Sequence, residues 1–303
     1  MRPDHEHALS VYAAHLKRRN LAPATAKKLT RTASYFLGWL GKPLARARQP
    51  DVRRYLAYRA RDLGAAAQVG ELSRLRGFLD ALVSHGLLPQ SPADGLRVQT
   101  PPRPARPLLS EEAVRALFEA ASRGAPGEHP ARALRDRACL ELLYGLGVRA
   151  SEARASLVPD LNLIEGSLLV RRVKHGDPRV LLLPPAALPH LERYLREGRP
   201  ALAGGRGRDR GRLLLSNRGS PLEPSGVAGI VRQVARRADR SAHPHAFRRA
   251  LASHLSKRGV SVLAIQELLG HRRLDTTQVY LTLDMADLRK AVEILEVGER
   301  LPG

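Results

Sequence analysis

The chain has 303 residues, enough for two domains of ordinary size, and its net charge of +22 favours a polyanionic partner. Its single cysteine, Cys139, excludes a disulfide framework and a cysteine-based metal site. No apolar run approaches the roughly 18–20 residues of a membrane span, and the N-terminal stretch MRPDHEHALS lacks the apolar core of a signal peptide, so we expect a cytoplasmic protein.

Residues 5–87 show the periodicity of four amphipathic helices, which predicts a small all-α bundle over 1–98. Residues 1–107 carry 19 basic and 7 acidic side chains, and residues 108–303 carry 32 and 22. Codon bias can explain why arginine outnumbers lysine by 44 to 7, but it does not explain the excess of basic over acidic residues. Because both parts are basic, we expect duplex DNA contacted from two sides.

The segment TPPRPARP contains four prolines and two arginines, so we interpret 99–107 as a stiff linker. The second domain, 108–303, begins with a helix capped by Ser110 and continues with a helix over about 131–145. SLLVRRV and RVLLLP around KHGDP predict a β-hairpin, and RLLLS predicts a further strand over 212–216.

The rest of the second domain is predicted to be helical. The expected helices cover roughly 186–197, 224–239, 245–257, 261–269 and 276–281. A final helix over about 284–297 has the apolar residues Leu288, Val292 and Leu295 on one face. The predicted fold class is therefore mainly α with one small antiparallel β-sheet, in two domains.

Two motifs in the first half of the second domain carry candidate chemistry. GLGVRASEA places Arg149 before a helix that Ser151 could cap, where a guanidinium can form a bidentate fork on a phosphate. Taken alone, it reads equally as a surface arginine. RRVKHGDPRV places Lys174 at a hairpin tip, and an ammonium can protonate a departing alkoxide. With seven lysines in the chain, chance remains an alternative for this position.

A third motif, HPHAFRRALASH, places His245 and Arg248 on one face of the first turn of a helix. Backbone N–H groups at that end favour an anion. The competing interpretation is a metal site formed by His243, His245 and His254. Their spacing fits no standard zinc pattern, and no carboxylate or cysteine is nearby in the sequence.

The fourth motif, LLGHRRLDTTQVY, contains His271 and Tyr280. Asp275 and Gln278 resemble a capping box, so a helix should begin at Thr276 and carry Tyr280 on its second turn. A tyrosine on a short helix is more often a core residue than a nucleophile. Combined with two arginines, a lysine and a second histidine, it completes the set that metal-free attack on a phosphodiester requires.

The ordered motifs resemble the tyrosine recombinase (integrase) family, most closely its Xer branch, along nearly the whole chain. The likeness is carried by GLRxSE-like, hairpin-lysine, HxLR-like and LLGH segments followed by a tyrosine. It implies six catalytic positions: Arg149, Lys174, His245, Arg248, His271 and Tyr280 as the nucleophile. It implies a supporting role for Glu152, and Arg171, Arg172, Arg272 and Arg273 are DNA-binding candidates. The chain departs from the family pattern at Val148, Val173, Phe247, Arg249 and Leu281–Thr282, none of which is a catalytic position.

The resemblance implies strand exchange through a 3′-phosphotyrosyl bond and a Holliday junction, with no metal, cofactor or ATP. It implies a core-binding domain over 1–98 and a catalytic domain over 108–303. The partners would be paired half-sites in duplex DNA, bound by a homo- or hetero-tetramer that exchanges the helix at 284–297. A second Xer-type recombinase and a septal DNA translocase are further possible partners, in chromosome or plasmid dimer resolution.

Three other functions remain open from the sequence. Integrases of phages or mobile elements share the same six residues. A type IB topoisomerase uses a related set, although the N-terminal bundle argues against it. A non-catalytic architectural DNA-binding protein would suit the charge of +22, but it would leave the six residues unexplained.

Overall fold

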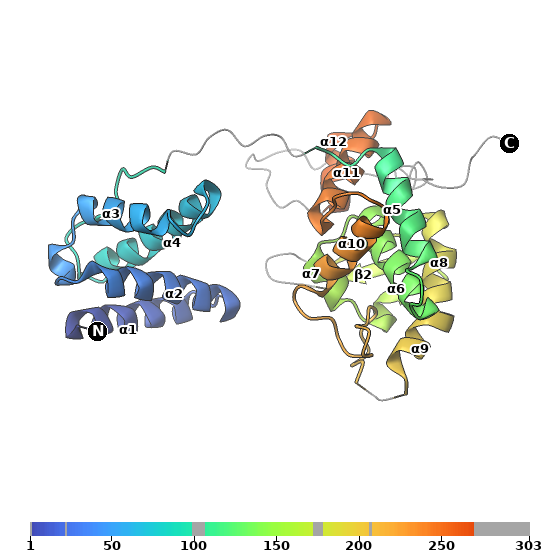
Figure 1. The fold of residues 1–303 in the computed structure, drawn as a ribbon, viewed down its shortest axis with the longest axis horizontal. Helices are drawn as coiled ribbons and strands as arrows, with labels where there is room; N and C mark the ends of the chain where they lie inside the picture. Colours follow the sequence, from blue (N-terminus) through green and yellow to red (C-terminus); the bar gives the residue numbers. More distant parts are fainter. Residues whose placement is uncertain (1, 22, 99–106, 172–177, 206–207, 270–303) are drawn as a thin grey trace. The chain divides into compact units, whose positions relative to one another are not determined.

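The computed structural model describes residues 2–21, 23–98, 107–171, 178–205 and 208–269 (Figure 1). The chain divides into two compact units, Met1–Arg106 and Pro107–Gly303. The predicted linker, apart from Pro107, lies outside the described residues, as does the predicted C-terminal helix at 284–297. No helix in the described ranges is long and apolar enough to cross a membrane.

The first unit is an all-α bundle, as predicted. Its elements are α1 (Pro3–Arg18), α2 (Pro23–Leu40), the short 3₁₀ helix η1 (Leu44–Arg46), α3 (Gln49–Arg59) and α4 (Ala65–Ser84). Helix α4 packs against the other three α-helices. The core between them contains four fully buried aromatic rings, from Tyr12, Phe36, Tyr55 and Phe78. This core is separate from that of the second unit, so each unit buries its own apolar surface.

A buried carboxylate joins three helices of this bundle. Glu71 on α4 accepts hydrogen bonds from Tyr55 on α3 (2.9 Å), from Thr32 on α2 (3.2 Å) and from its neighbour Arg74 (2.7 Å). Arg74 also donates to Thr32 through Nε, at 3.1 Å. Burial by itself raises the pKa of Glu71, but these hydrogen bonds outweigh it, so the pKa lies below its ordinary value.

The second unit is mostly helical and holds the sheet. Its first elements are α5 (Glu111–Arg123), α6 (Pro130–Leu140), η2 (Glu141–Gly145), α7 (Ala150–Ala155), η3 (Val158–Asp160), β1 (Leu161–Asn162), β2 (Ser167–Val170) and β3 (Arg179–Leu182). After the sheet follow η4 (Pro185–Ala187), α8 (Leu188–Arg193), η5 (Tyr194–Gly198), α9 (Arg199–Ala203), α10 (Gly226–Arg237), α11 (Pro244–Lys257) and α12 (Val262–Leu269). In Figure 1, α10 runs beside α5 and α6, and it also contacts α7.

The three strands form one antiparallel sheet in the order β1-β2-β3. The pairing of β2 with β3 confirms the predicted hairpin, and its last described pair is Val170 opposite Arg179. The prediction of a strand over 212–216 is wrong, because this segment makes only isolated β-bridges. Leu213, Leu214 and Leu215 are fully buried, and side chains of Tyr194 and Arg135 donate to their carbonyls, so the apolar run is a buried irregular segment.

The helix predicted over 131–145 changes its geometry near its end. It is α-helical to Leu140 and then widens into the π-helical turn η2. The chain leaves this turn through Gly147, whose φ of +61° lies in the left-handed region. Helix α11 packs on η2, and α12 packs on α11, so the turn at Gly147 faces two later helices. These contacts define one wall of the candidate site.

Candidate active site

A cleft of about 560 Å³ lies between the start of α7 and the start of α11. Its lining residues are Val148, Arg149, Ala150, Ser151, Arg154, Pro224, His243, Pro244, His245 and Arg248. Three of the six residues predicted as catalytic, Arg149, His245 and Arg248, are therefore brought together from segments about a hundred residues apart. The other three, Lys174, His271 and Tyr280, lie outside the described residues.

Arg149 is placed by the first turn of α7. It is the N-cap residue of that helix, in place of the predicted Ser151, and its own backbone N–H donates to Glu152 Oε2 at 2.8 Å. Its guanidinium also donates to Glu152 Oε1 at 2.9 Å. The Arg149 side chain remains 43% exposed and lines the cleft. Glu152 thus fixes both the backbone and the side chain of Arg149.

Glu152 is buried, with only 4% of its side chain exposed, and it has a second arginine partner. Arg179, at the start of β3, donates from its two terminal nitrogens to both carboxylate oxygens, at 3.1 and 3.0 Å. Burial by itself raises the pKa of Glu152, but the hydrogen bonds from Arg179 and from the Arg149 backbone lower it below its ordinary value. The carboxylate is therefore ionised at neutral pH.

Arg248 forms the floor of the cleft, where only 4% of its surface is exposed. Its guanidinium donates to the carbonyls of Gly147 and Leu269, so it joins the turn before Arg149 to the end of α12. Burial, and next the positive charge of Arg149, lower the pKa of Arg248 to about 10. It still carries its proton at pH 7, so the cleft has a buried cation beside a more exposed one.

His245 lies on the first turn of α11 and is exposed at the cleft. His243 is the N-cap of this helix, and its Nδ1 accepts from the Ala246 N–H at 3.1 Å. His254 is buried in the core, where its ring pairs with the Tyr144 hydroxyl at 2.9 Å. The three histidines considered as a metal set therefore have different environments. In the part of the chain that the structure describes, no group of three or more His, Cys, Asp or Glu side chains could hold a metal ion.

The four DNA-binding candidates are only partly described. Arg171 follows β2, is 55% exposed, and forms an ion pair of 2.6 Å with the buried Asp160. Arg172, Arg272 and Arg273 lie outside the described residues.

Two charged residues of the site were not predicted from the sequence. Arg179 contacts Glu152, which lies 27 residues earlier in the chain, and no local periodicity records such a pair. Arg154 lines the cleft one helical turn beyond Ser151, and among the described residues it makes no ion pair. The one available signal was the spacing of Ser151 and Arg154, which places them on one face of a short helix.

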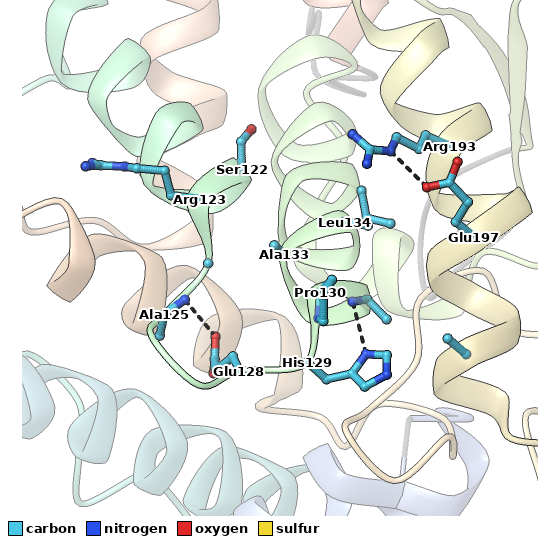
Figure 2. A pocket seen from close by; sticks show the side chains of 13 residues that line it. Ser122, Arg123, Ala125, Glu128, His129, Pro130, Ala133, Leu134, Arg193 and Glu197 are labelled. Atoms are coloured by element: carbon cyan, nitrogen blue, oxygen red, sulfur yellow. Dashed lines mark hydrogen bonds and ion pairs between the residues drawn. The ribbon is translucent and has the colours of Figure 1, made fainter.

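A second hollow, of about 320 Å³, lies between α5, α6, α8 and η5 (Figure 2). Its polar side chains pair locally. Arg193 donates to Glu197 at 2.9 Å, the Glu128 carboxylate accepts from the Ala125 N–H, and the His129 ring accepts from the Ala131 N–H. These are capping and surface interactions, so this hollow has no comparable set of cations directed at one point.

Residues 107–287 match the model of the Phage integrase family. The chain belongs to this family, the tyrosine recombinases. Two similar relatives are a tyrosine recombinase XerD of Ralstonia nicotianae and a tyrosine recombinase XerC of Pelobacter propionicus. The first is 33% identical over 264 residues, covering 86% of this chain and 83% of the relative. The second is 32% identical over 309 residues, covering 97% and 96%. The chain is thus a DNA breaking and rejoining enzyme.

Solved structures show that the fold is shared. A lambda integrase fragment, residues 75–356, solved as a dimer bound to a COC′ core site, has a TM-score of 0.69 at 17% identity and covers 98% of both chains. A lambda integrase tetramer bound to a Holliday junction also has a TM-score of 0.69, at 18% identity, covering 91% of this chain and 79% of that chain. Both likenesses concern the arrangement of the backbone.

Proposed function

We propose that this tyrosine recombinase is a site-specific enzyme of the Xer type, which resolves dimers of chromosomes or plasmids through a phosphotyrosyl bond to Tyr280. One observation carries the proposal: Arg149, His245 and Arg248 line a single cleft although they come from distant parts of the chain. Identities of 32–33% over most of the chain support the family, and the XerC and XerD names of those relatives are the ground for proposing the Xer role.

The cleft suits the phosphate of a DNA backbone. Two arginines there can donate to the non-bridging oxygens, and both stay charged while negative charge develops on them in the transition state. The ring of His245, at the positive end of the 14-residue helix α11, adds a further donor. Because Arg248 is buried, its charge is weakly screened by water, and its attraction for the reacting phosphate is correspondingly stronger.

Chain connectivity supports the roles proposed for the remaining residues. The Leu269 carbonyl is held by Arg248, and His271 follows Leu269 by two residues in the sequence. Lys174 lies between Arg171 and Arg179 in the sequence. Arg179 donates hydrogen bonds to Glu152, which also accepts from Arg149. Tyr280 is eleven residues beyond Leu269, which lets it reach its own cleft or that of a neighbouring copy.

The proposed reaction has two matched steps. The phenol of Tyr280 gives its proton to solvent as its oxygen attacks phosphorus, the bond from phosphorus to the 5′ oxygen breaks, and Lys174 protonates that oxygen. The 5′-hydroxyl of a partner strand then attacks the 3′-phosphotyrosine and returns its proton to the neutral Lys174 amine, while Tyr280 leaves and takes up a proton from solvent. Each step exchanges one phosphoester bond for another, so the reaction draws on no external source of energy.

Strand exchange requires several copies of the enzyme on DNA. The lambda integrase solved as a tetramer on a Holliday junction shares this fold, which supports a homo- or hetero-tetramer on paired half-sites. We propose that the segment 284–297, with its apolar positions Leu288, Val292 and Leu295, docks on a neighbouring copy. A second Xer-type recombinase and a septal DNA translocase are the further partners in this proposal.

The test uses covalent capture. Randomly nicked fragments of the source organism's chromosome serve as the probe, because a nick near the cut lets the released strand diffuse away and traps the adduct. The wild-type chain should form adducts at one chromosomal locus, and Tyr280→Phe should bind the same DNA without forming any. A Tyr280→Phe adduct would refute the nucleophile, and wild-type capture only at the ends of a mobile element would replace the Xer role by integration.

A further inference from the structure

Among the described residues, the Arg179 side chain makes polar contact with a single residue. Its two terminal nitrogens bind the two oxygens of Glu152, and its Nε is buried without a hydrogen-bond partner. Among the described residues, Glu152 is its only polar partner. The side chain is only 17% exposed, so its guanidinium has lost most of its contact with water and depends on Glu152 for hydrogen bonding. Such a placement points to a role that depends on Glu152.

Glu152 in turn is the residue that holds Arg149. Its carboxylate shares two oxygens between two arginines, so the three side chains together carry one net positive charge. Without Arg179, the charge of the buried carboxylate would be balanced chiefly by Arg149, to which it is hydrogen-bonded. Arg149 would then be drawn toward Glu152, and its attraction for a phosphate in the cleft would fall.

The position of Arg179 in the sheet adds a second link. Arg179 pairs with Val170 in the last described pair of the β2–β3 hairpin, and Lys174 lies between these two residues in the sequence. Its contact with Glu152 therefore ties this hairpin to α7. One arginine thus joins the helix that begins after Arg149 to the strand that follows Lys174 in the sequence.

We propose that Arg179 is a positioning residue for DNA cleavage, which compensates the charge of Glu152 and so leaves the positive charge of Arg149 available and oriented toward the reacting phosphate. The inference rests on the proposed function of the cleft. Arg179 itself does not line the cleft, so it acts through Glu152 rather than by touching DNA.

The chain offers a control in Arg237 on α10. Arg237 is 16% exposed, contacts the buried carboxylate of Asp136 and, at 3.4 Å, the carboxylate of Glu128, and has a buried Nε without a partner, so its burial resembles that of Arg179. Asp136 also binds Arg135, and neither of these residues lines the cleft. Replacing Arg179 or Arg237 by Met should therefore perturb the fold similarly, while only the first change reaches Arg149.

The experiment measures two quantities on the DNA recovered by covalent capture: the single-turnover rate of adduct formation and the dissociation constant. Arg179→Met should slow adduct formation by on the order of 100-fold, as expected for a displaced catalytic group, with less than about a threefold change in affinity. Arg237→Met should cleave within about threefold of wild type. Arg179→Lys keeps the charge but loses the bidentate geometry, and should retain the rate within about tenfold of wild type.

Three outcomes would overturn the inference: a wild-type rate in Arg179→Met, an equal loss in Arg237→Met, or Arg179→Lys as slow as Arg179→Met. Thermal melts of the two Met variants check that they are similarly folded. If the wild-type chain formed no adduct, the proposed function would fail and this role would fail with it. A normal wild-type adduct with a normal Arg179→Met rate would refute only the role of Arg179.

Discussion

Gly147 lies where the turn before Arg149 packs against α11 and the end of α12. Its φ is +61°, and a Cβ atom added there would lie 2.6 Å from Leu269 Cδ2 and 2.8 Å from Leu251 Cδ2. Its carbonyl accepts from Arg248. The absence of a side chain therefore lets the end of α12 pack directly on the turn that leads to Arg149.

We predict that Gly147→Ala destabilises the second unit by about 2–3 kcal/mol, because both the backbone conformation and the space are unsuitable for a side chain. It should also slow DNA cleavage more than it weakens binding, since the end of α12 must shift away from Arg248. Denaturant unfolding and the capture assay measure the two effects. Gly229→Ala is the control: this helical glycine of α10 has open space, so alanine should stabilise by up to about 1 kcal/mol. Equal effects of the two changes would contradict the argument.

The residues that line the cleft were predictable from the sequence where the signal lies in their near neighbours along the chain. Arg149, His245 and Arg248 stand in motifs whose spacing suggests their chemistry, and the structure brings all three into one cleft. Arg179 stands in the hairpin motif, but the sequence does not identify its role, because its partner Glu152 belongs to another element. A single sequence carries no record of which buried carboxylate an arginine meets.

Helices and strands were likewise predictable where their signal is local. The amphipathic helices of both units were predictable, since apolar periodicity reflects burial of one face. The run RLLLS was predicted as a strand because a short apolar run fits a buried strand, yet 212–216 pairs its carbonyls with side chains of Tyr194 and Arg135. The widening of the helix at η2 was also missed, because it satisfies the backbone near Gly147 in a way that residue types do not show.

Glu71 provides a test of how the helices of the first unit are held together. Glu71→Ala should lower the free energy of unfolding at pH 7 by about 2–4 kcal/mol, because it leaves the buried Tyr55 hydroxyl and the partly buried Arg74 without their carboxylate partner. The folded pKa of Glu71 is lowered, so its contribution is present above the unfolded pKa of about 4.3 and is lost as pH falls through the folded value. The difference in free energy of unfolding between wild type and Glu71→Gln should therefore become smaller as the pH falls. The matched change Glu6→Gln, at an exposed position of α1, should show little effect, and a pH-independent difference for Glu71→Gln would contradict the ionised network.

Across the whole molecule, positive charge is spread over both units. The exposed cations Lys27, Lys28 and Arg31 lie within about one turn of each other on α2, and none makes an ion pair with another described residue. In the second unit, Arg154 lines the cleft beside Arg149. If both units contact phosphates, each should contribute its own share of released counterions when DNA binds.

The dependence of DNA affinity on salt separates these shares. Neutralising Lys27, Lys28 and Arg31 together by alanine should reduce the slope of log K against log salt by up to about 3, and Arg154→Ala should reduce it by about 1. The reductions should add in the combined variant, because the two sets lie on separate units with separate cores. Anisotropy titrations at several salt concentrations measure the slopes. Arg193→Ala, which removes a cation already paired with Glu197, should leave the slope nearly unchanged. An unaltered slope in the triple variant would show that this face of α2 does not meet the phosphates, and DNA contact by the first unit would then have to use another face.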